Sequence, residues 1–183
     1  MKKKSGNPRR CTAQTAPLVR GPLNCKAKGD LAELAFLHKA ASLGFGVAKP
    51  NGDKEYYDFI LDSGERFWRV QVKSTSYTEP DRNAYVVNAC HNDKGRKVKA
   101  YQAAEVDFIA VYLVPIDVWY IVPVNQLGAL RSLRLYPSGC HGADRFEAFR
   151  EAWHLMAPGA DLPQPRTLRR VPAPSRHGKR FVE

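Results

Sequence analysis

The sequence predicts a mixed α/β layer fold, and three observations support this prediction. The chain has 183 residues, a length that suits one domain. Hydrophobic residues make up 44% of it and charged residues 26%, as in ordinary globular proteins. A segment with helical spacing of apolar residues is followed by short segments that are either continuously apolar or alternate between apolar and polar residues, which is typical of strands. The predicted order of elements is αββββαββα.

Each predicted element has a local reason in the sequence. Residues 29–43 are predicted to form a helix, because apolar residues recur at helical spacing and Gly44 follows as a stop signal. Ser63 and Gly64 are predicted to form a two-residue hairpin turn between the second and third strands. A short helix is predicted at residues 98–104 and a closing helix at residues 146–155. The predicted strands are residues 46–48, 57–61, 67–74, 84–89, 108–114 and 119–124.

Basic residues gather at the two ends of the chain. The formal net charge is +11, yet residues 29–155 carry 15 basic and 16 acidic residues. Residues 1–28 hold eight Lys or Arg and no acid, and residues 156–183 combine six basic residues with repeated proline. We therefore expect a disordered basic tail at residues 1–27, a folded domain at residues 28–155 and a disordered Pro/Arg-rich tail at residues 156–183. Such tails favour a polyanion as partner, and a solubilising role is the alternative.

Several classes of protein and site are disfavoured. The longest apolar run, residues 108–116, is too short to span a membrane. The lysine-rich start leads into polar residues rather than an apolar stretch, so we expect no secretory signal, a cytoplasmic location and reduced cysteines. Cys90 with His91 and Cys140 with His141 could in principle offer four zinc ligands. Because neighbouring residues on a strand point to opposite faces, we do not favour that zinc site.

The first predicted helix carries an acidic residue on its apolar face. That face is formed by Leu34, Phe36, Leu37, Ala40, Ala41 and Leu43, and Glu33 falls in its middle. A carboxylate held there needs a partner, a metal or a raised pKa, because burying an unpaired charge is costly. A structural ion pair, or a helix end that frays into water, would explain Glu33 without a functional role.

The predicted hairpin brings polar residues to one face of the sheet. Alternation along the third strand points Arg69, Gln71 and Lys73 to one face and the apolar residues between them to the other. With a two-residue turn, Phe59 faces Trp68, and Asp58 faces Arg69 with Gln71 one pleat away. Asp58, Gln71 and Lys73 are therefore expected to converge. The water-facing side of an ordinary sheet would show the same alternation.

These residues carry a resemblance to a known family. Glu33, Asp58 after Tyr56-Tyr57, and Gln71-Val72-Lys73-Ser74-Thr75 resemble the core motifs of the PD-(D/E)XK nuclease superfamily. Within it, the chain is most similar to small endonucleases that include an intron-encoded homing endonuclease and the archaeal Holliday junction resolvases. The resemblance covers about residues 28–127 and implies a restriction-endonuclease-like core, a mixed central sheet flanked by helices in the order αβββαβ. Tyr57 stands where the family has proline, and Gln71 stands at an acidic position.

The resemblance also implies roles for the site residues. Asp58 would bind Mg²⁺ (or Mn²⁺) directly, the Gln71 side chain and the Val72 main chain would add carbonyl oxygens, and Glu33 would be an outer ligand acting through water. Lys73 would orient or help deprotonate the attacking water and offset charge on the phosphate. Ser74 and Thr75 would contact the phosphate backbone. Further DNA contacts are expected from the basic residues Lys2, Lys3, Lys4, Arg9, Arg10, Arg20, Lys26, Lys28 and Arg69.

The sequence thus predicts a metal-dependent DNA endonuclease that hydrolyses phosphodiester bonds and has no membrane partner. Cutting both strands with one site per chain favours a homodimer or a higher symmetric oligomer. One alternative is a non-catalytic DNA-binding module that retains the nuclease fold and lost tight metal binding through Gln71. Another is an RNA- or protein-binding factor that uses only its tails. Tyr101 and Asp107 are predicted to stabilise a turn rather than to bind substrate.

Overall fold

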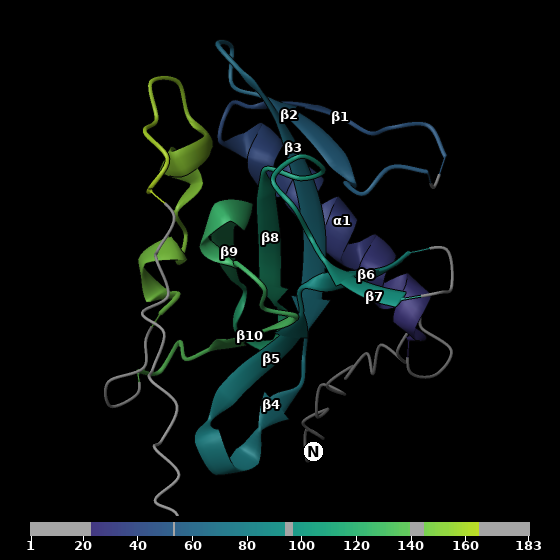
Figure 1. Cartoon of the computed structure of the whole chain (residues 1–183), viewed down its shortest axis with the longest axis vertical. Helices are drawn as coiled ribbons and strands as arrows, with labels where there is room; N and C mark the ends of the chain where they lie inside the picture. Colours follow the sequence, from purple (N-terminus) through teal and green to yellow (C-terminus); the bar gives the residue numbers. More distant parts are fainter. Residues whose placement is uncertain (1–22, 53, 94–96, 140–144, 165–183) are drawn as a thin grey trace, which may run out of the picture.

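The fold is built on a five-stranded mixed sheet (Figure 1). The computed structural model describes residues 23–52, 54–93, 97–139 and 145–164. Strand β3 pairs in parallel with β8, and the other neighbours pair antiparallel. This confirms the predicted mixed α/β core, with each predicted strand of the sheet found within two residues of its expected bounds. In sheet order the strands are β1 (Gly46–Ala48), β2 (Phe59–Asp62), β3 (Phe67–Thr75), β8 (Phe108–Leu113) and β9 (Val118–Pro123).

One long helix, α1 (Cys25–Ser42), packs on this sheet (Figure 1). It begins four residues before the predicted start because the side chain of Asn24 accepts the Ala27 N–H at 2.8 Å and caps it. Its buried residues are Ala32, Phe36 and Ala40, spaced four apart. The predicted broad apolar face was wrong in part, because only this narrow line is fully buried. Leucines beside the line stay exposed, namely Leu34 at 60%, Leu37 at 38% and Leu43 at 48%.

The hairpin between β2 and β3 has a longer turn than predicted. The Ser63 N–H donates to the Arg66 carbonyl at 3.0 Å, so residues 63–66 form the connection. Phe59 therefore pairs with Val70 rather than with Trp68, a register shift of two residues. A shift of two keeps every side chain on its predicted face. Asp58 still lies on the same face as Gln71, and its backbone N–H donates to the Val70 carbonyl at 2.9 Å.

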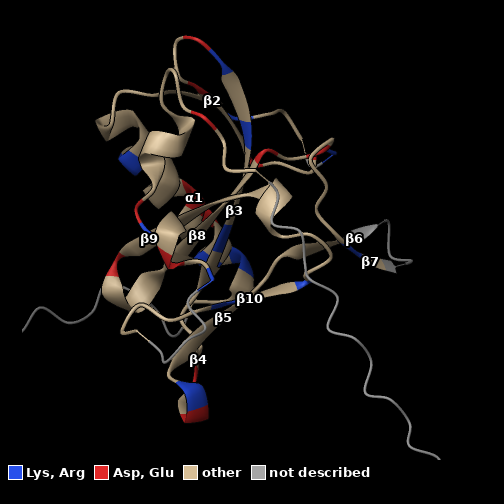
Figure 2. Cartoon of the chain, turned by 60° about the vertical axis from the view of Figure 1, so that its left-hand side comes forward, with Lys and Arg blue, Asp and Glu red and all other residues tan. Residues whose placement is uncertain are grey.

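Two smaller sheets lie beside the main one. The first has the order β10-β5-β4, with β10 (Ser132–Leu135), β5 (Ala84–Asn88) and β4 (Thr78–Glu79). The second is a hairpin of β6 (Cys90–Asp93) and β7 (Lys97–Ala100), which projects from the body in Figures 1 and 2. The helix predicted at residues 98–104 was therefore wrong. Lys97, Val98, Lys99 and Ala100 of β7 pair with β6, and the segment 101–105, with a turn at residues 103–105, follows.

The closing helix predicted at residues 146–155 was also wrong. Two short 3₁₀ turns, η4 (Glu147–Phe149) and η5 (Trp153–Met156), replace it. Between them Arg150 forms a bridge with Tyr120, and Glu151 adopts a left-handed φ of 47°. The Glu151 carboxylate accepts the Trp119 N–H at 2.7 Å. Because this segment packs against β9, it does not form the continuous helix that the spacing of its apolar residues predicted.

Hydrophobic clusters cover both faces of the main sheet. The α1 side holds aromatic residues in mutual contact, with the Phe36 ring 5.2 Å from Phe59 and 5.6 Å from Trp153. The opposite side is packed by β5, β10 and the segments that follow β7 and β9, around Ile109, Val111 and Val122.

Basic and acidic positions are interspersed over the described residues in Figure 2. Three further 3₁₀ turns are η1 (Pro80–Arg82), η2 (Val114–Ile116) and η3 (Val124–Gln126). Within the described ranges, no helix is both long and apolar enough to cross a membrane.

Candidate active site

A cavity of about 740 Å³ gathers the predicted site residues. It lies where the ladder between β2 and β3 ends, beyond the Phe59–Val70 pair. Residues from α1, from the segment before β2 and from the carboxyl half of β3 line it. The predicted residues among them are Glu33, Asp58, Gln71, Val72, Lys73, Ser74 and Thr75. Three separate parts of the predicted pattern therefore meet in one place.

Asp58 is the central carboxylate of the cavity. Its Oδ2 accepts the Val72 backbone N–H at 2.8 Å and a side-chain N–H of Gln71. Burial raises the pKa of Asp58 above its ordinary value, and the nearby Glu33 charge raises it further. The Val72 N–H, the Lys73 charge and the Gln71 N–H act in the opposite direction and lower this pKa. Asp58 is thus a mostly buried carboxylate that is held in place by two hydrogen bonds and is costly to ionise.

Gln71 is buried beside it and is 8% exposed. Its Nε2 donates to Asp58 and, at 3.3 Å, to the Val72 carbonyl. Both donations use the amide nitrogen, so the amide carbonyl oxygen takes no part in them. The amide nitrogen thus faces Asp58 and the Val72 carbonyl, and the amide would have to turn over before its oxygen could join them as a neutral ligand.

Lys73 faces the same cavity from the next position on that side of β3. Burial lowers the pKa of Lys73 below that of an exposed lysine, while the Asp58 charge acts to raise it. Among the described residues, no hydrogen bond or ion pair within 4.0 Å holds its ammonium group. The structure instead places the ammonium 5.5 Å from the centre of the Tyr101 ring.

Glu33 has a protein partner. The Lys49 ammonium donates to Glu33 Oε2 at 2.6 Å, which is the structural ion pair that the sequence left open. This hydrogen bond and the Glu33 charge raise the pKa of Lys49. Glu33 remains 24% exposed at its side chain and lines the cavity with Asp58. Glu33 thus sits at the rim of the cavity with a cation beside it.

The donor set of the cavity suits a hard divalent cation. Two carboxylates, one side-chain amide oxygen and the Val72 main-chain carbonyl supply oxygen only, the ligand type that Mg²⁺ and Mn²⁺ prefer. In the described part of the chain, no group of three or more His, Cys, Asp or Glu could hold a metal. A cation at this cavity would therefore depend on neutral oxygens as much as on carboxylates. The zinc site that the sequence disfavoured is not tested, because Cys140 and His141 lie outside the described residues.

The predicted DNA contacts divide into three groups. Lys26 and Lys28 are exposed on the first turn of α1, and Lys28 also lines the cavity. Ser74 and Thr75 line the cavity too, although the Thr75 hydroxyl already accepts the Tyr77 N–H at 3.0 Å. The tail residues Lys2, Lys3, Lys4, Arg9, Arg10 and Arg20 lie outside the described residues.

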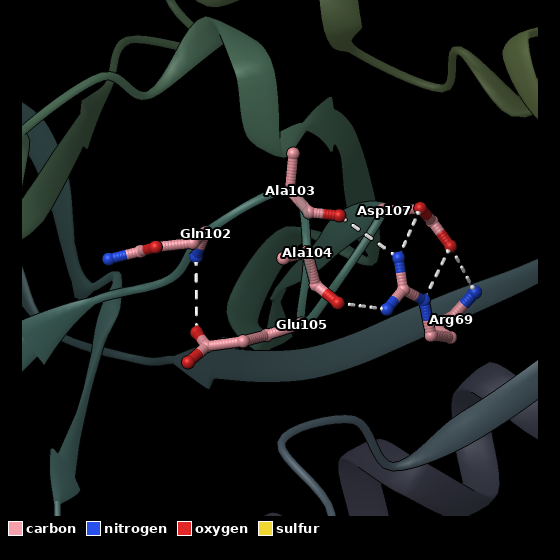
Figure 3. Close-up of polar contacts among 6 residues, drawn as sticks. All are labelled: Arg69, Gln102, Ala103, Ala104, Glu105 and Asp107. Atoms are coloured by element: carbon pink, nitrogen blue, oxygen red, sulfur yellow. Dashed lines mark hydrogen bonds and ion pairs between the residues drawn. The ribbon is translucent and has the colours of Figure 1, made fainter.

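Arg69 forms several hydrogen bonds within the protein (Figure 3), although its side chain is only half-buried. Its Nε and one terminal nitrogen donate to the two oxygens of Asp107, at 3.1 and 2.9 Å. The same guanidinium donates to the backbone carbonyls of Ala103, at 3.0 Å, and Ala104. These contacts do not support the expectation that Arg69 binds DNA. The predicted turn-stabilising pair of Tyr101 and Asp107 is not found among the described residues, because the Asp107 side chain bonds to Arg69, which itself binds the carbonyls of the turn.

Sequence reasoning missed two residues around the cavity. Lys49 lies on the loop after β1, and only the three-dimensional packing of that loop brings it to Glu33. Tyr101 is 4% exposed and reaches Lys73 from the turn after β7. The unpaired carboxylate on the helix signalled that a cation was needed, but not which one. Nothing in the local sequence pointed from Lys73 to Tyr101.

Comparisons with known proteins bear on the family and the fold of the chain. A family model described as PD-(D/E)XK endonuclease matches residues 23–156. The solved structure of a bacterial homing endonuclease, I-Ssp6803I, is similar to this chain with a TM-score of 0.64 and 30% sequence identity. The match covers 72% of this chain and 92% of that one. No curated protein sequence matches the chain.

The buried charge of Asp58 leads to a stability prediction for the metal-free protein. Near neutral pH, Asp58→Asn should raise the melting temperature by a few degrees, because it removes a buried charge and keeps an oxygen for the Val72 N–H. An acid with a raised pKa in the folded state stabilises that state fully below its ordinary pKa, and this contribution is lost as pH rises through the raised pKa. The advantage of Asn should therefore shrink as the pH falls.

Thermal melts in EDTA at neutral and acidic pH measure this difference. Asp62→Asn is the matched control, since Asp62 lies at the other end of β2 and its carboxylate accepts only the Gly64 N–H among the described residues. A wild type that melts above Asp58→Asn at neutral pH would contradict the prediction.

Proposed function

Since the chain belongs to the PD-(D/E)XK endonuclease family, we propose that it is a metal-dependent endonuclease that hydrolyses phosphodiester bonds of DNA. The observation that carries this proposal is the convergence of Glu33, Asp58, Gln71, Val72 and Lys73 on one cavity. The similar solved structure, with 30% identity, is that of a homing endonuclease, and this supports DNA as the substrate.

We propose roles for the chain's residues that their positions support. Asp58, Gln71 and the Val72 carbonyl would hold a divalent cation, with Glu33 as an outer ligand at the rim. A bound cation would supply Lewis-acid stabilisation of the charge that develops on the phosphate. Lys73 lies beside the same cavity, where it would orient the attacking water and offset that charge. Water would then attack phosphorus, and the bond to the leaving sugar oxygen would break.

One observation favours the alternative of a non-catalytic DNA-binding module. Glu33 and Asp58 are the two acidic residues of the cavity, and Lys49 and Lys73 offset both charges. Gln71 adds none, so a cation would meet a nearly neutral site. Cleavage assays with Mg²⁺ and Mn²⁺ on plasmid and branched DNA, beside binding assays in EDTA, separate the two functions. Binding in EDTA without any cleavage in metal would favour the non-catalytic module.

We further propose that the chain acts as a symmetric oligomer, because one cavity per chain serves one strand of a duplex. The basic tails at residues 1–27 and 156–183 are proposed to supply affinity that does not depend on sequence.

Asp58→Ala and Lys73→Ala should each abolish DNA cleavage while leaving most of the DNA affinity intact. The first removes the carboxylate that anchors the cation, and the second removes the charge beside the attacking water. Single-turnover cleavage and binding of labelled DNA in EDTA measure the two properties. Lys39→Ala serves as the matched lysine control, because Lys39 lies on α1 outside the cavity. Wild-type cleavage rates in both site variants would overturn the proposed function.

Gln71→Glu should increase the affinity for Mg²⁺ by adding a charge at the site without changing its shape. Cleavage need not rise with it, because the added charge also repels phosphate and attracts Lys73. Gln71→Leu removes the amide oxygen while keeping much of the volume, so it should raise the Mg²⁺ concentration for half-maximal cleavage. Mg²⁺ titrations of the three proteins on one DNA substrate, with thermal melts as folding controls, test this. Three superimposable titrations would show that Gln71 does not bind the cation.

Deleting residues 1–22 should weaken binding to all DNA sequences and flatten its dependence on salt. The deletion removes six Lys or Arg and stops before Asn24, which caps α1. If all six contact phosphate, the slope of log affinity against log salt should fall by about five units, from roughly 0.9 per contact. A full-length variant with the six residues changed to Gln controls for chain length. An unchanged slope in both variants would exclude the tail from DNA binding.

A further inference from the structure

The ammonium group of Lys73 has an aromatic partner rather than a carboxylate. Its Nζ lies 5.5 Å from the centre of the Tyr101 ring, within the range of a cation–π interaction. No salt bridge or hydrogen bond to another described residue competes with this contact. The ring attracts the ammonium without a conventional hydrogen bond, so the N–H groups that point away from the ring stay available to a water molecule or a phosphate oxygen.

The Tyr101 ring is itself held by neighbouring rings. It is 4% exposed and lies 5.0 Å from the His91 ring, which lies 4.4 Å from the Tyr56 ring. Tyr56 precedes Asp58 by two residues, so this stack joins the segment before β2 to the turn after β7. Burial raises the pKa of the Tyr101 hydroxyl, which keeps the ring neutral at neutral pH. The ring therefore adds no negative charge beside the cavity.

The turn that carries Tyr101 is tied to β3 at its far end. Arg69, on β3, bonds to Asp107, Ala103 and Ala104, as Figure 3 shows. Within the turn, Glu105 accepts the Gln102 N–H at 3.3 Å, and the Glu105 carboxylate lies 3.6 Å from His91 Nε2. Because Arg69 and Lys73 lie on the same strand, these contacts fix the ring relative to the lysine it faces.

We propose that Tyr101 is a positioning residue that holds the Lys73 ammonium at the cavity through the face of its ring. This inference rests on the proposed nuclease function. Lysine has a long and flexible stem, and a carboxylate partner would occupy its donors and repel the phosphate. A neutral ring avoids both effects. The contact with Lys73 assigns Tyr101 a role beyond packing and beyond the turn-stabilising role that the sequence suggested.

Graded fluorination of the ring tests this role without changing its shape. Tyr101→Phe and its mono-, di- and trifluorinated phenylalanine analogues weaken the attraction of the ring face for a cation in steps. The single-turnover cleavage rate is measured at saturating DNA and Mg²⁺. It should stay within about twofold of wild type for Tyr101→Phe. For the trifluorinated ring it should be about tenfold lower, a loss typical of one cation–π contact. DNA affinity and the Mg²⁺ half-saturation should not change. The same series at Phe108, a buried ring packed against Trp68, is the control.

A second measurement uses the free protein and does not depend on cleavage. The ε-methylene protons of Lys73, assigned with Lys73→Arg, should show an upfield ring-current shift that is lost in Tyr101→Leu. A flat fluorination series, or a Lys73 resonance without this shift, would overturn the inference. A wild-type protein that shows the shift yet cuts no DNA would instead overturn the proposed function and leave the ring contact standing.

Discussion

The carboxylate of Asp58 joins the two strands on which the site depends. It accepts the Val72 N–H and a Gln71 N–H just beyond the last pair of the β2–β3 ladder. Buried N–H groups need partners, and beyond that point β2 supplies none from its backbone. The side chain therefore continues the connection while the strands separate and the cavity opens between them. The hydrogen bonds that hold the strands also fix the position of a buried charge, so folding and the proposed chemistry rely on the same group.

The sequence predicted the central strands well, because their signal is local. The apolar segments of β8 and β9 are buried on both faces, and continuous apolar runs of this length indicate buried strands. The two predicted helices that the structure does not contain were short segments whose conformation is set by contacts with residues distant in the sequence. The first residues of the segment 98–104 pair with β6 in a hairpin, and the segment around Glu151 forms a hydrogen bond with β9. Helical spacing over a few residues could not outweigh those contacts.

The polar centre of the site was predictable although the hairpin register was wrong. Asp58, Gln71 and Lys73 were expected on one face, and a register error of two residues leaves that face unchanged. An error of one residue would have placed Asp58 on the opposite face from Gln71 and Lys73. Partners that come from other elements could not be predicted in this way. Lys49 beside Glu33 and Tyr101 beside Lys73 depend on how a loop and a turn pack, which alternation within a strand does not encode.

The charges at the cavity bear on the order in which its ligands would bind. Lys49 offsets Glu33, Lys73 offsets Asp58, and Gln71 contributes no charge. An acidic residue at position 71 would attract a cation more strongly and would also repel the phosphate. A nearly neutral cavity does neither. Under the proposed function, the phosphate oxygens would supply the negative charge that Gln71 withholds, so cation and DNA would each favour binding of the other. The free protein would then hold its cation weakly, and the complete site would form only on DNA.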